Sequence, residues 1–182
     1  MKVLIITLLI LTASFGLNAK EYREEETVRC AQNKTKRCDL NGKLITGTVK
    51  EYWPNGNLAA EAFFEKGKME GVAKTYRENG NLEREISYKK GKENGPAKFY
   101  YESGKLKSEG YSKNGKPDGI MKLYYENGNL KSEQTFKNGV ADGPVKVYYE
   151  NGSLQGEGYN QKGFPPEVTY SYDKDGTKHK LK

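Results

Sequence analysis

The chain has 182 residues, of which 35% are hydrophobic and 30% charged, and its formal net charge is +7 at pH 7. Globular domains are usually roughly 45–50% apolar by a count that includes glycine, which explains part of the gap, and the remaining shortfall argues against a thick, closed hydrophobic core. The 14 tyrosines favour a thin structure in which tyrosine supplies most of the apolar material.

Residues 1–19 have the features of a secretory signal peptide. Lys2 gives a basic start, residues 3–11 form an apolar run, and Ala19 ends a small-residue cleavage site. The run is shorter than the roughly 20 residues of a membrane-spanning helix. We therefore expect export to the periplasm, the cell surface or the medium, with an uncleaved N-terminal membrane anchor as the alternative.

Residues 20–37 form a charged N-terminal segment that contains the first of the two cysteines. An oxidising compartment favours a disulfide between Cys30 and Cys38. Such a bridge would pin the N-terminal edge of the fold and stabilise it by on the order of 2–3 kcal/mol. We expect no metal site, because the one histidine, His179, lies in the basic tail formed by residues 177–182.

Residues 38–176 repeat with a period of 24 residues. Tyrosine recurs at one position of each unit, and glycine recurs four residues later. The tyrosines are Tyr52, Tyr76, Tyr100, Tyr124, Tyr148 and Tyr172, and the glycines are Gly56, Gly80, Gly104, Gly128, Gly152 and Gly176. A fixed period of this length predicts an array of stacked supersecondary units. We expect five full units, with degenerate units at both ends that act as caps.

Each unit consists of two runs of alternating polarity separated by Asn-Gly or Ser-Gly, and a wider turn leads to the next unit. This pattern is typical of strands, and no window has a helical period. We therefore predict an all-β fold, an elongated antiparallel meander of β-hairpins in an open, single-layer sheet.

The Asn-Gly pairs predict two-residue hairpin loops in which both residues have positive φ. With Asn79-Gly80 as the loop, Lys74 lies opposite Glu85, and every unit has an equivalent pair. The pairs are Lys50–Glu61, Lys74–Glu85, Lys98–Glu109, Lys122–Glu133 and Lys146–Glu157. Directly opposed opposite charges stabilise a sheet by roughly 0.2–1 kcal/mol per pair.

The same register sorts the side chains onto two faces. Met121, Leu123, Tyr125 and Leu130 fall on an apolar face, and the Lys–Glu pairs share the other face with the repeating tyrosines. The candidate binding face is formed by Lys50, Tyr52, Lys74, Tyr76, Lys98, Tyr100, Lys122, Tyr124, Lys146 and Tyr148. Aromatic and cationic columns suit sugars, anionic polymers or the extended edge of a partner protein. The alternative is that these residues serve the fold alone.

Residues 124–133, Tyr-Tyr-Glu-Asn-Gly-Asn-Leu-Lys-Ser-Glu, together with Lys-Asn-Gly and Asp-Gly within residues 137–143, resemble the bacterial variant of the MORN repeat. The resemblance covers roughly residues 38–176, and related bacterial proteins are classed as YwqK-like antitoxins. It implies a meander of hairpins that binds or scaffolds, in association with membrane-proximal proteins, protein partners or acidic phospholipids. This chain has tyrosine and lysine where the better-known form has tryptophan and histidine-glycine.

A second resemblance concerns the Tyr-Tyr-x-x-x-Gly rhythm, which is similar to that of choline-type cell-wall-binding repeats. Those repeats build cages rich in tryptophan, whereas Trp53 is the only tryptophan of this chain.

The sequence predicts neither catalysis nor a cofactor. The repeated carboxylates face lysines, and no serine has a histidine partner that could act as its base. We expect a non-catalytic protein that binds a protein partner at the cell envelope, as a scaffold, an adhesion module or an immunity-type module. The alternative is binding of anionic lipid or glycan through the Lys/Tyr face. The balancing glutamates argue against nucleic acid, and the open sheet edges are compatible with a monomer or with weak end-to-end association.

Overall fold

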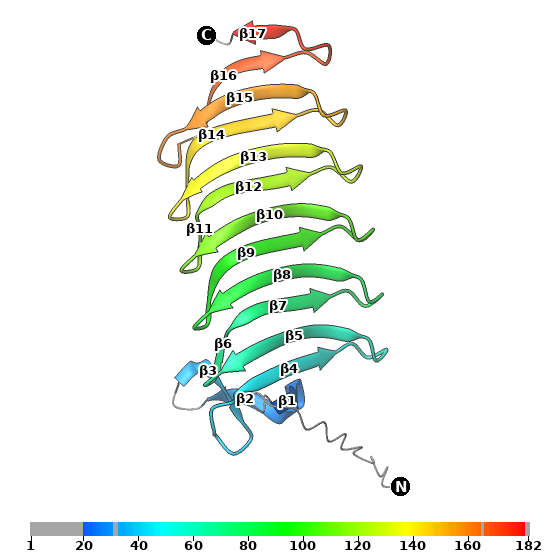
Figure 1. Ribbon diagram of the computed structural model, residues 1–182, viewed down its shortest axis with the longest axis vertical. Helices are drawn as coiled ribbons and strands as arrows, with labels where there is room; N and C mark the ends of the chain where they lie inside the picture. The colour runs from blue at the N-terminus through cyan, green and yellow to red at the C-terminus, as the bar shows by residue number, and fades with distance from the viewer. Residues whose placement is uncertain (1–19, 31–32, 165, 181–182) are drawn as a thin grey trace, which may run out of the picture.

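A computed structural model describes residues 20–30, 33–164 and 166–180 (Figure 1). They form a 15-stranded sheet and a separate two-stranded sheet, with one short 3₁₀ helix, η1, at Glu24–Glu26. The all-β prediction is confirmed. The predicted signal segment, residues 1–19, lies outside the described residues. In the part of the chain that is described, no helix is long and apolar enough to cross a membrane.

The large sheet is an elongated meander in which hairpins that follow one another in sequence lie side by side (Figure 1). Its main strands are β4 (Gly47–Tyr52), β5 (Leu58–Glu65), β7 (Gly71–Tyr76), β8 (Leu82–Lys89), β9 (Lys92–Tyr100), β10 (Leu106–Lys113), β12 (Gly119–Tyr124), β13 (Leu130–Lys137), β14 (Val140–Tyr148), β15 (Leu154–Asn160) and β16 (Glu167–Tyr172). The short strands β6 (Lys68–Met69) and β11 (Lys116–Pro117) pair with β5 and β10, and β17 (Lys178–Lys180) forms the C-terminal edge. Each unit adds two strands, which is roughly 10 Å of sheet.

The N-terminal edge departs from the predicted antiparallel pattern. β1 (Lys20–Arg23) pairs with β4 in parallel, so the sheet is mixed. Parallel neighbours need a long crossover connection. Residues 24–46 provide it, and they contain η1 and the small sheet of β2 (Thr27–Cys30) and β3 (Asn33–Asp39).

The small sheet is tied both to itself and to the large sheet. A disulfide joins Cys30 to Cys38, and the Cys38 side chain is almost completely buried. The Arg37 N–H donates to the Gly67 carbonyl at 2.8 Å, and the Ile45 N–H donates to the Arg37 carbonyl at 3.2 Å. The crossover is therefore fixed to the large sheet at Arg37 in its middle and, through the bond from the Gly67 N–H to the Ile45 carbonyl, near its end.

The two kinds of turn are the reverse of those predicted. The loops at Asn-Gly and Ser-Gly contain three residues: the Gly80 N–H donates to the Arg77 carbonyl, and the Arg77 N–H donates to the Asn81 carbonyl, each at 2.8 Å. Positive φ occurs at Gly80 (86°) but not at Asn79. Asn79 instead accepts a hydrogen bond at Oδ1 from the Asn81 N–H, at 2.9 Å. This is the Asx turn for which asparagine is favoured.

The two-residue turns lie on the opposite side of the sheet, where the sequence predicted a wider connection. Both residues have positive φ in Lys66-Gly67, Lys90-Gly91, Asn114-Gly115, Asn138-Gly139 and Lys162-Gly163. The flanking residues pair directly, as Lys89 does with Lys92. We call this side of the sheet the turn edge, and the side with the three-residue loops the loop edge.

The predicted register is nevertheless observed over the body of each hairpin. In the second unit Lys74 lies opposite Glu85, but Tyr76 lies opposite Leu82, so Glu83 is left over as a β-bulge. A three-residue loop with a one-residue bulge gives the same pairing beyond the bulge as a two-residue loop. Close to the loops the prediction is wrong, because the bulge pairs Leu130 with Tyr124 on the face of the repeating tyrosines rather than with Tyr125.

The hydrophobic core is thin and lies at the N-terminal end. Ile45, Val49 and Phe64 form a buried cluster, with Tyr22 and Met69 packed against it. Of the described residues beyond Ile86 in β8, no aliphatic or aromatic side chain is buried. The rest of the sheet is a single layer that is accessible on both faces.

Candidate functional site

A continuous ladder of lysine and glutamate side chains runs down one face of the sheet, which we call the ladder face. Within the hairpins the register places Lys50 opposite Glu61, Lys74 opposite Glu85, Lys98 opposite Glu109, Lys122 opposite Glu133 and Lys146 opposite Glu157. Between hairpins the alternation continues, since each of the first four glutamates also lies opposite the lysine of the next unit.

The lysines pair unevenly with these glutamates. Lys74 Nζ lies 3.6 Å from Glu85, whereas Lys146 Nζ approaches Glu133 of the preceding unit at 3.9 Å. Lys50 turns to Glu21 in β1, at 3.0 Å. Among the described residues, no carboxylate lies within 4.0 Å of the ammonium groups of Lys98 and Lys122. The centre of the ladder therefore presents two lysines that are available to a ligand.

The repeating tyrosines bind the glutamates of the preceding unit. The hydroxyl of Tyr76 donates to Glu61 at 3.0 Å, and the equivalent bonds are Tyr100 to Glu85 (2.9 Å), Tyr124 to Glu109 (2.7 Å), Tyr148 to Glu133 (3.2 Å) and Tyr172 to Glu157 (2.6 Å). Burial, strengthened by the adjacent carboxylate, raises the pKa of Tyr76 and Tyr124 to about 12. These hydroxyls are already engaged, so the tyrosines link units and offer a ligand only their rings.

Tyr52 is the one repeating tyrosine that has no glutamate of a preceding unit to bind. It stands in the first unit, is 43% exposed, and has the Arg23 guanidinium over its ring at 5.6 Å. Its partner is thus the N-terminal strand rather than a preceding hairpin.

An exposed apolar strip, which the sequence reasoning missed, flanks the ladder on the same face. Each ladder lysine except Lys50 is preceded two residues earlier by an apolar residue, and residues two apart on a strand share a face. The strip consists of Val72, Pro96, Tyr111, Ile120, Pro144 and Tyr159, where Tyr111 lies opposite Pro96 and Tyr159 opposite Pro144. Val72, Tyr111, Ile120 and Tyr159 are 50%, 47%, 54% and 51% exposed. The signal was the recurrence of Val, Pro, Ile and Pro two residues before the lysines.

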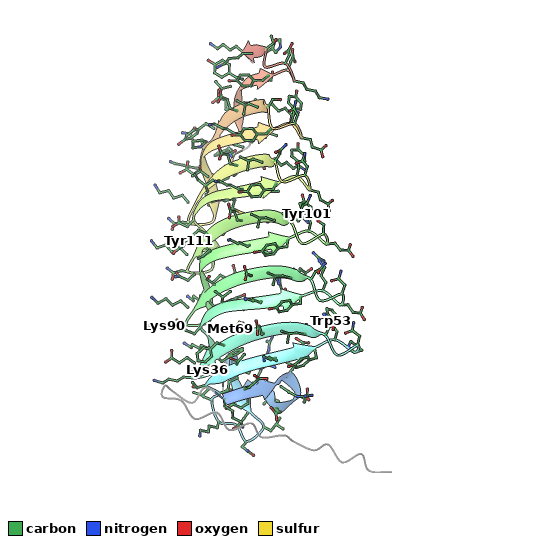
Figure 2. The ribbon with its side chains drawn as sticks, turned by 45° about the vertical axis from the view of Figure 1, so that its right-hand side comes forward. Lys36, Trp53, Met69, Lys90, Tyr101 and Tyr111 are labelled. Atoms are coloured by element: carbon green, nitrogen blue, oxygen red, sulfur yellow. A yellow bond between two sulfur atoms is a disulfide. The ribbon has the colours of Figure 1, made fainter. Side chains whose placement is uncertain are left out.

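The loop edge carries a second repeated contact. The residue after each repeating tyrosine donates from its side chain to the backbone carbonyl of the next repeating tyrosine. The donors are Trp53, Arg77, Tyr101, Tyr125 and Tyr149, which reach Tyr76, Tyr100, Tyr124, Tyr148 and Tyr172 at 2.6 to 3.0 Å. Loop asparagines add bonds of the same kind, as from Asn55 and Asn57 to the Glu78 carbonyl. Figure 2 shows Trp53 and Tyr101 at this edge, and Lys90 at the turn edge.

Grooves lie between successive loops on the loop edge. One has a volume of about 650 Å³ and is lined by Trp53, Tyr76, Arg77, Glu78, Asn79, Glu83 and Glu102. Another, of about 660 Å³, is lined by Tyr125, Asn127, Tyr149, Glu150, Asn151, Gln155 and Lys174. Most of these residues correspond, because Trp53 and Tyr125, like Glu102 and Lys174, stand three units apart. The repeat therefore builds the same groove more than once.

The residues that the structure describes offer little that could bind a metal ion or act as a general base. They contain no group of three or more His, Cys, Asp or Glu side chains that could hold a metal ion. His179 is exposed near the C-terminus, with Nε2 2.8 Å from Asp173 Oδ2. Each ladder glutamate accepts a hydrogen bond from the repeating tyrosine of the following unit.

Comparison with known proteins identifies one family. The pattern described as MORN repeat variant matches five consecutive segments, residues 45–66, 69–90, 93–114, 117–138 and 141–160. These segments begin near β4 and end with β15, so they coincide with the regular hairpins and leave out the N-terminal crossover. No curated protein is similar enough to the chain to count as a match.

Proposed function

Since the chain belongs to the MORN repeat variant family, we propose that it is a non-catalytic binding protein whose open sheet acts as a protein-interaction scaffold at the cell envelope. Adhesion and immunity-type neutralisation are two forms that such a scaffold can take. The family consists of repeat proteins, and MORN repeats often bind membrane lipids or proteins.

The observation that carries this proposal is the exposed apolar strip on the ladder face. It places Val72, Tyr111, Ile120 and Tyr159 in one row with about half of each side chain accessible. Pro96, Tyr111 and Ile120 lie on the adjacent strands β9, β10 and β12 and form its central patch, whereas Ser87 and Thr135 separate Val72 and the Pro144–Tyr159 pair from that patch. An exposed apolar patch bordered by charged residues is typical of protein interaction sites. The ladder supplies the polar border, and Lys98 and Lys122 supply charges that a partner's carboxylates can meet.

Export is part of the same proposal. Residues 1–19 have the composition of a signal peptide. The Cys30–Cys38 disulfide supports an oxidising compartment, because such bonds are rare in the cytosol.

A second candidate function is binding of anionic lipid or glycan through the lysines of the ladder face. It is favoured by the net charge of +7 and by Lys98 and Lys122, whose ammonium groups have no carboxylate of the described residues within 4.0 Å. Such binding would weaken steeply as ionic strength rises, whereas binding through the apolar strip would not.

Site-specific photo-crosslinking in envelope extract tests both candidates. A photoreactive residue at Ile120 lies in the strip, and one at Leu123 on the same strand serves as the control because its side chain points to the opposite face. We expect the Ile120 probe to capture a defined protein at low and at high salt, and the strip variants Val72→Ser and Tyr111→Ser to abolish capture. Adducts with lipid or glycan alone, lost at high salt and in Lys98→Glu/Lys122→Glu, would establish the second candidate instead. Equal capture by both probes, or none, would contradict the scaffold.

A further inference from the structure

The grooves of the loop edge carry an inference that is independent of the ladder face. We propose that they bind an uncharged, extended β-1,4-linked glycan, with one sugar stacked on the ring of Trp53 and the others bonded to the polar groups of successive loops. The argument rests on the lining of the grooves, on their charge and on their spacing.

The lining combines flat rings with hydrogen-bonding groups that suit a polyhydroxylated ligand. In the first groove the Trp53 ring is 38% exposed and stands beside Arg77, Asn79 and the carboxylates of Glu78 and Glu102. In the other groove the rings of Tyr125 and Tyr149 stand beside Asn127, Asn151 and Gln155. Sugar rings have an apolar C–H face that stacks on aromatic side chains, and hydroxyls that bond to carboxylates and amides at the same time.

The two grooves carry opposite excess charge, so a chain that spans both meets repulsion in one of them if it is charged. Three carboxylates, those of Glu78, Glu83 and Glu102, line the first groove and would repel a phosphate or sulfate. In the other groove the ammonium groups of Lys131 and Lys174 lie over the rings of Tyr125 and Tyr149, at 5.4 and 5.9 Å, and would repel a cationic ligand from these rings. A neutral ligand avoids both penalties.

Among the aromatic residues that follow the repeating tyrosines on the loop edge, Trp53 has the most exposed ring. In the later units a lysine reaches over the ring from the bulge position, as Lys107 does over Tyr101 and Lys131 over Tyr125. In the first unit this position is held by Ala59, which leaves the tryptophan without such a lysine. The single tryptophan of the chain therefore stands in the groove that is most open to stacking.

The distance between successive loops matches the repeat distance of an extended polymer. Successive loops are two strands apart, or roughly 10 Å, and Figure 1 shows them aligned along one long edge of the sheet. An extended β-1,4-linked chain repeats every two sugars over a comparable distance, so equivalent sugars would meet equivalent loops. An α-1,4-linked chain coils and would not stay in register.

Tryptophan fluorescence of the full chain provides a direct test, because Trp53 is the only tryptophan. The probes are chitohexaose and cellohexaose, with maltohexaose as the α-linked control and chitobiose as the short control. We expect a saturable change in Trp53 emission with a β-1,4 hexasaccharide, no dependence on salt, and affinity at least tenfold weaker for the disaccharide, since a longer chain engages several loops at once.

Calorimetry on variants locates the site. Trp53→Ala should abolish hexasaccharide binding and Glu102→Ala should weaken it, whereas Tyr111→Ala on the ladder face should leave it unchanged; circular dichroism checks that each variant is folded. The proposal is overturned if neither β-1,4 hexasaccharide binds, if maltohexaose binds equally well, or if folded Trp53→Ala binds like the unmodified chain. None of these outcomes bears on the protein scaffold, which is tested at Ile120.

Discussion

The residue after each repeating tyrosine shows how different side chains fill one structural role. Trp53, Arg77 and Tyr101 share only a donor group at the end of a long side chain, yet each bonds to the same carbonyl of the next unit. Sequence reasoning missed this role because it compares residue types, and an indole, a guanidinium and a phenol look unrelated. The repeating tyrosine was found because it does not vary.

Arg77 fills this role at a cost. Its Nε is buried and has no acceptor among the described residues, although Nη1 and Nη2 bond to Glu83 and to the Tyr100 carbonyl. An unmade hydrogen bond of this kind costs about 1–3 kcal/mol. Tyrosine, which stands here in the next three units, has no such extra donor. We expect Arg77→Tyr to raise the free energy of unfolding by about 1 kcal/mol in denaturant titrations. Arg77→Phe removes the same donor but leaves the Tyr100 carbonyl without its bond, so it should gain less, and a loss of stability in Arg77→Tyr would refute the explanation.

The tyrosine–glutamate bonds predict how stability changes at alkaline pH. The pKa values of Tyr76 and Tyr124 are raised to about 12 in the folded chain, whereas tyrosine in an unfolded chain titrates near pH ~10. The folded state holds these protons more tightly, so their contribution is complete below about pH 10 and is lost as the pH rises to about 12. Unfolding titrations over this range should show a shallower loss of stability in Tyr76→Phe/Tyr124→Phe than in the unmodified chain. Parallel curves would mean that these hydroxyls are not the groups that titrate.

At the level of the element, the alternation of polar and apolar residues predicts the register of the hairpins but not the type of their turns. The 24-residue period and the placement of Lys74 opposite Glu85 follow from side chains that alternate in faces, and both are observed. The turn type does not follow, because a three-residue loop with a bulge at Glu83 and a two-residue loop give the same pairing. What distinguishes them is whether asparagine adopts positive φ or accepts a backbone bond, and Asn-Gly permits both.

Glycine substitution should distinguish the two kinds of turn. Asn138 has φ 52° in a two-residue turn, so Asn138→Gly relieves an unfavourable conformation and should leave stability unchanged or slightly higher. Asn79 does not have positive φ, and Asn79→Gly removes the acceptor of the Asn81 N–H, so we expect a loss of about 1 kcal/mol. Thermal unfolding of the two variants gives the comparison. A larger loss at Asn138 than at Asn79 would restore the turn assignment made from the sequence.

At the scale of the whole molecule, burial is distributed unequally along a uniform repeat. Ile45, Val49, Phe64 and Ile86 lie near the N-terminal end, whereas all three residues of the C-terminal strand β17 are exposed. The sequence could predict a thin sheet from its composition, but not this gradient, because the core depends on the crossover that brings Tyr22 and Ile45 against β4 and β5. The apolar strip was missed for a related reason: prolines alternate with Val72 and Ile120, and proline is not typical of strands.

Hydrogen exchange should reveal this gradient. We expect the amides of β4, β5, β7 and β8 to exchange last and those of β16 and β17 first, because each unit is held mainly by its neighbours and the buried residues lie at one end. Reduction of the Cys30–Cys38 bond should destabilise the protected end by about 2–3 kcal/mol and flatten the gradient. Uniform exchange along the sheet, or strongest protection at β16, would show that the buried cluster does not anchor the fold.

Two of the contacts that join one unit to the next recur at each junction of the regular hairpins. On the loop edge a side chain reaches the next tyrosine carbonyl, and on the turn edge a glycine N–H bonds to a carbonyl of the unit before, as Gly91 does to Met69 and Gly139 to Pro117. A unit inserted or removed between two others would present its neighbours with the groups they already bond. The length of the protein can therefore change in steps of one unit, roughly 10 Å each, while its two edges and two faces stay as they are. The number of repeat units therefore sets the length of the sheet, and with it the distance between any ligands that bind at its two ends.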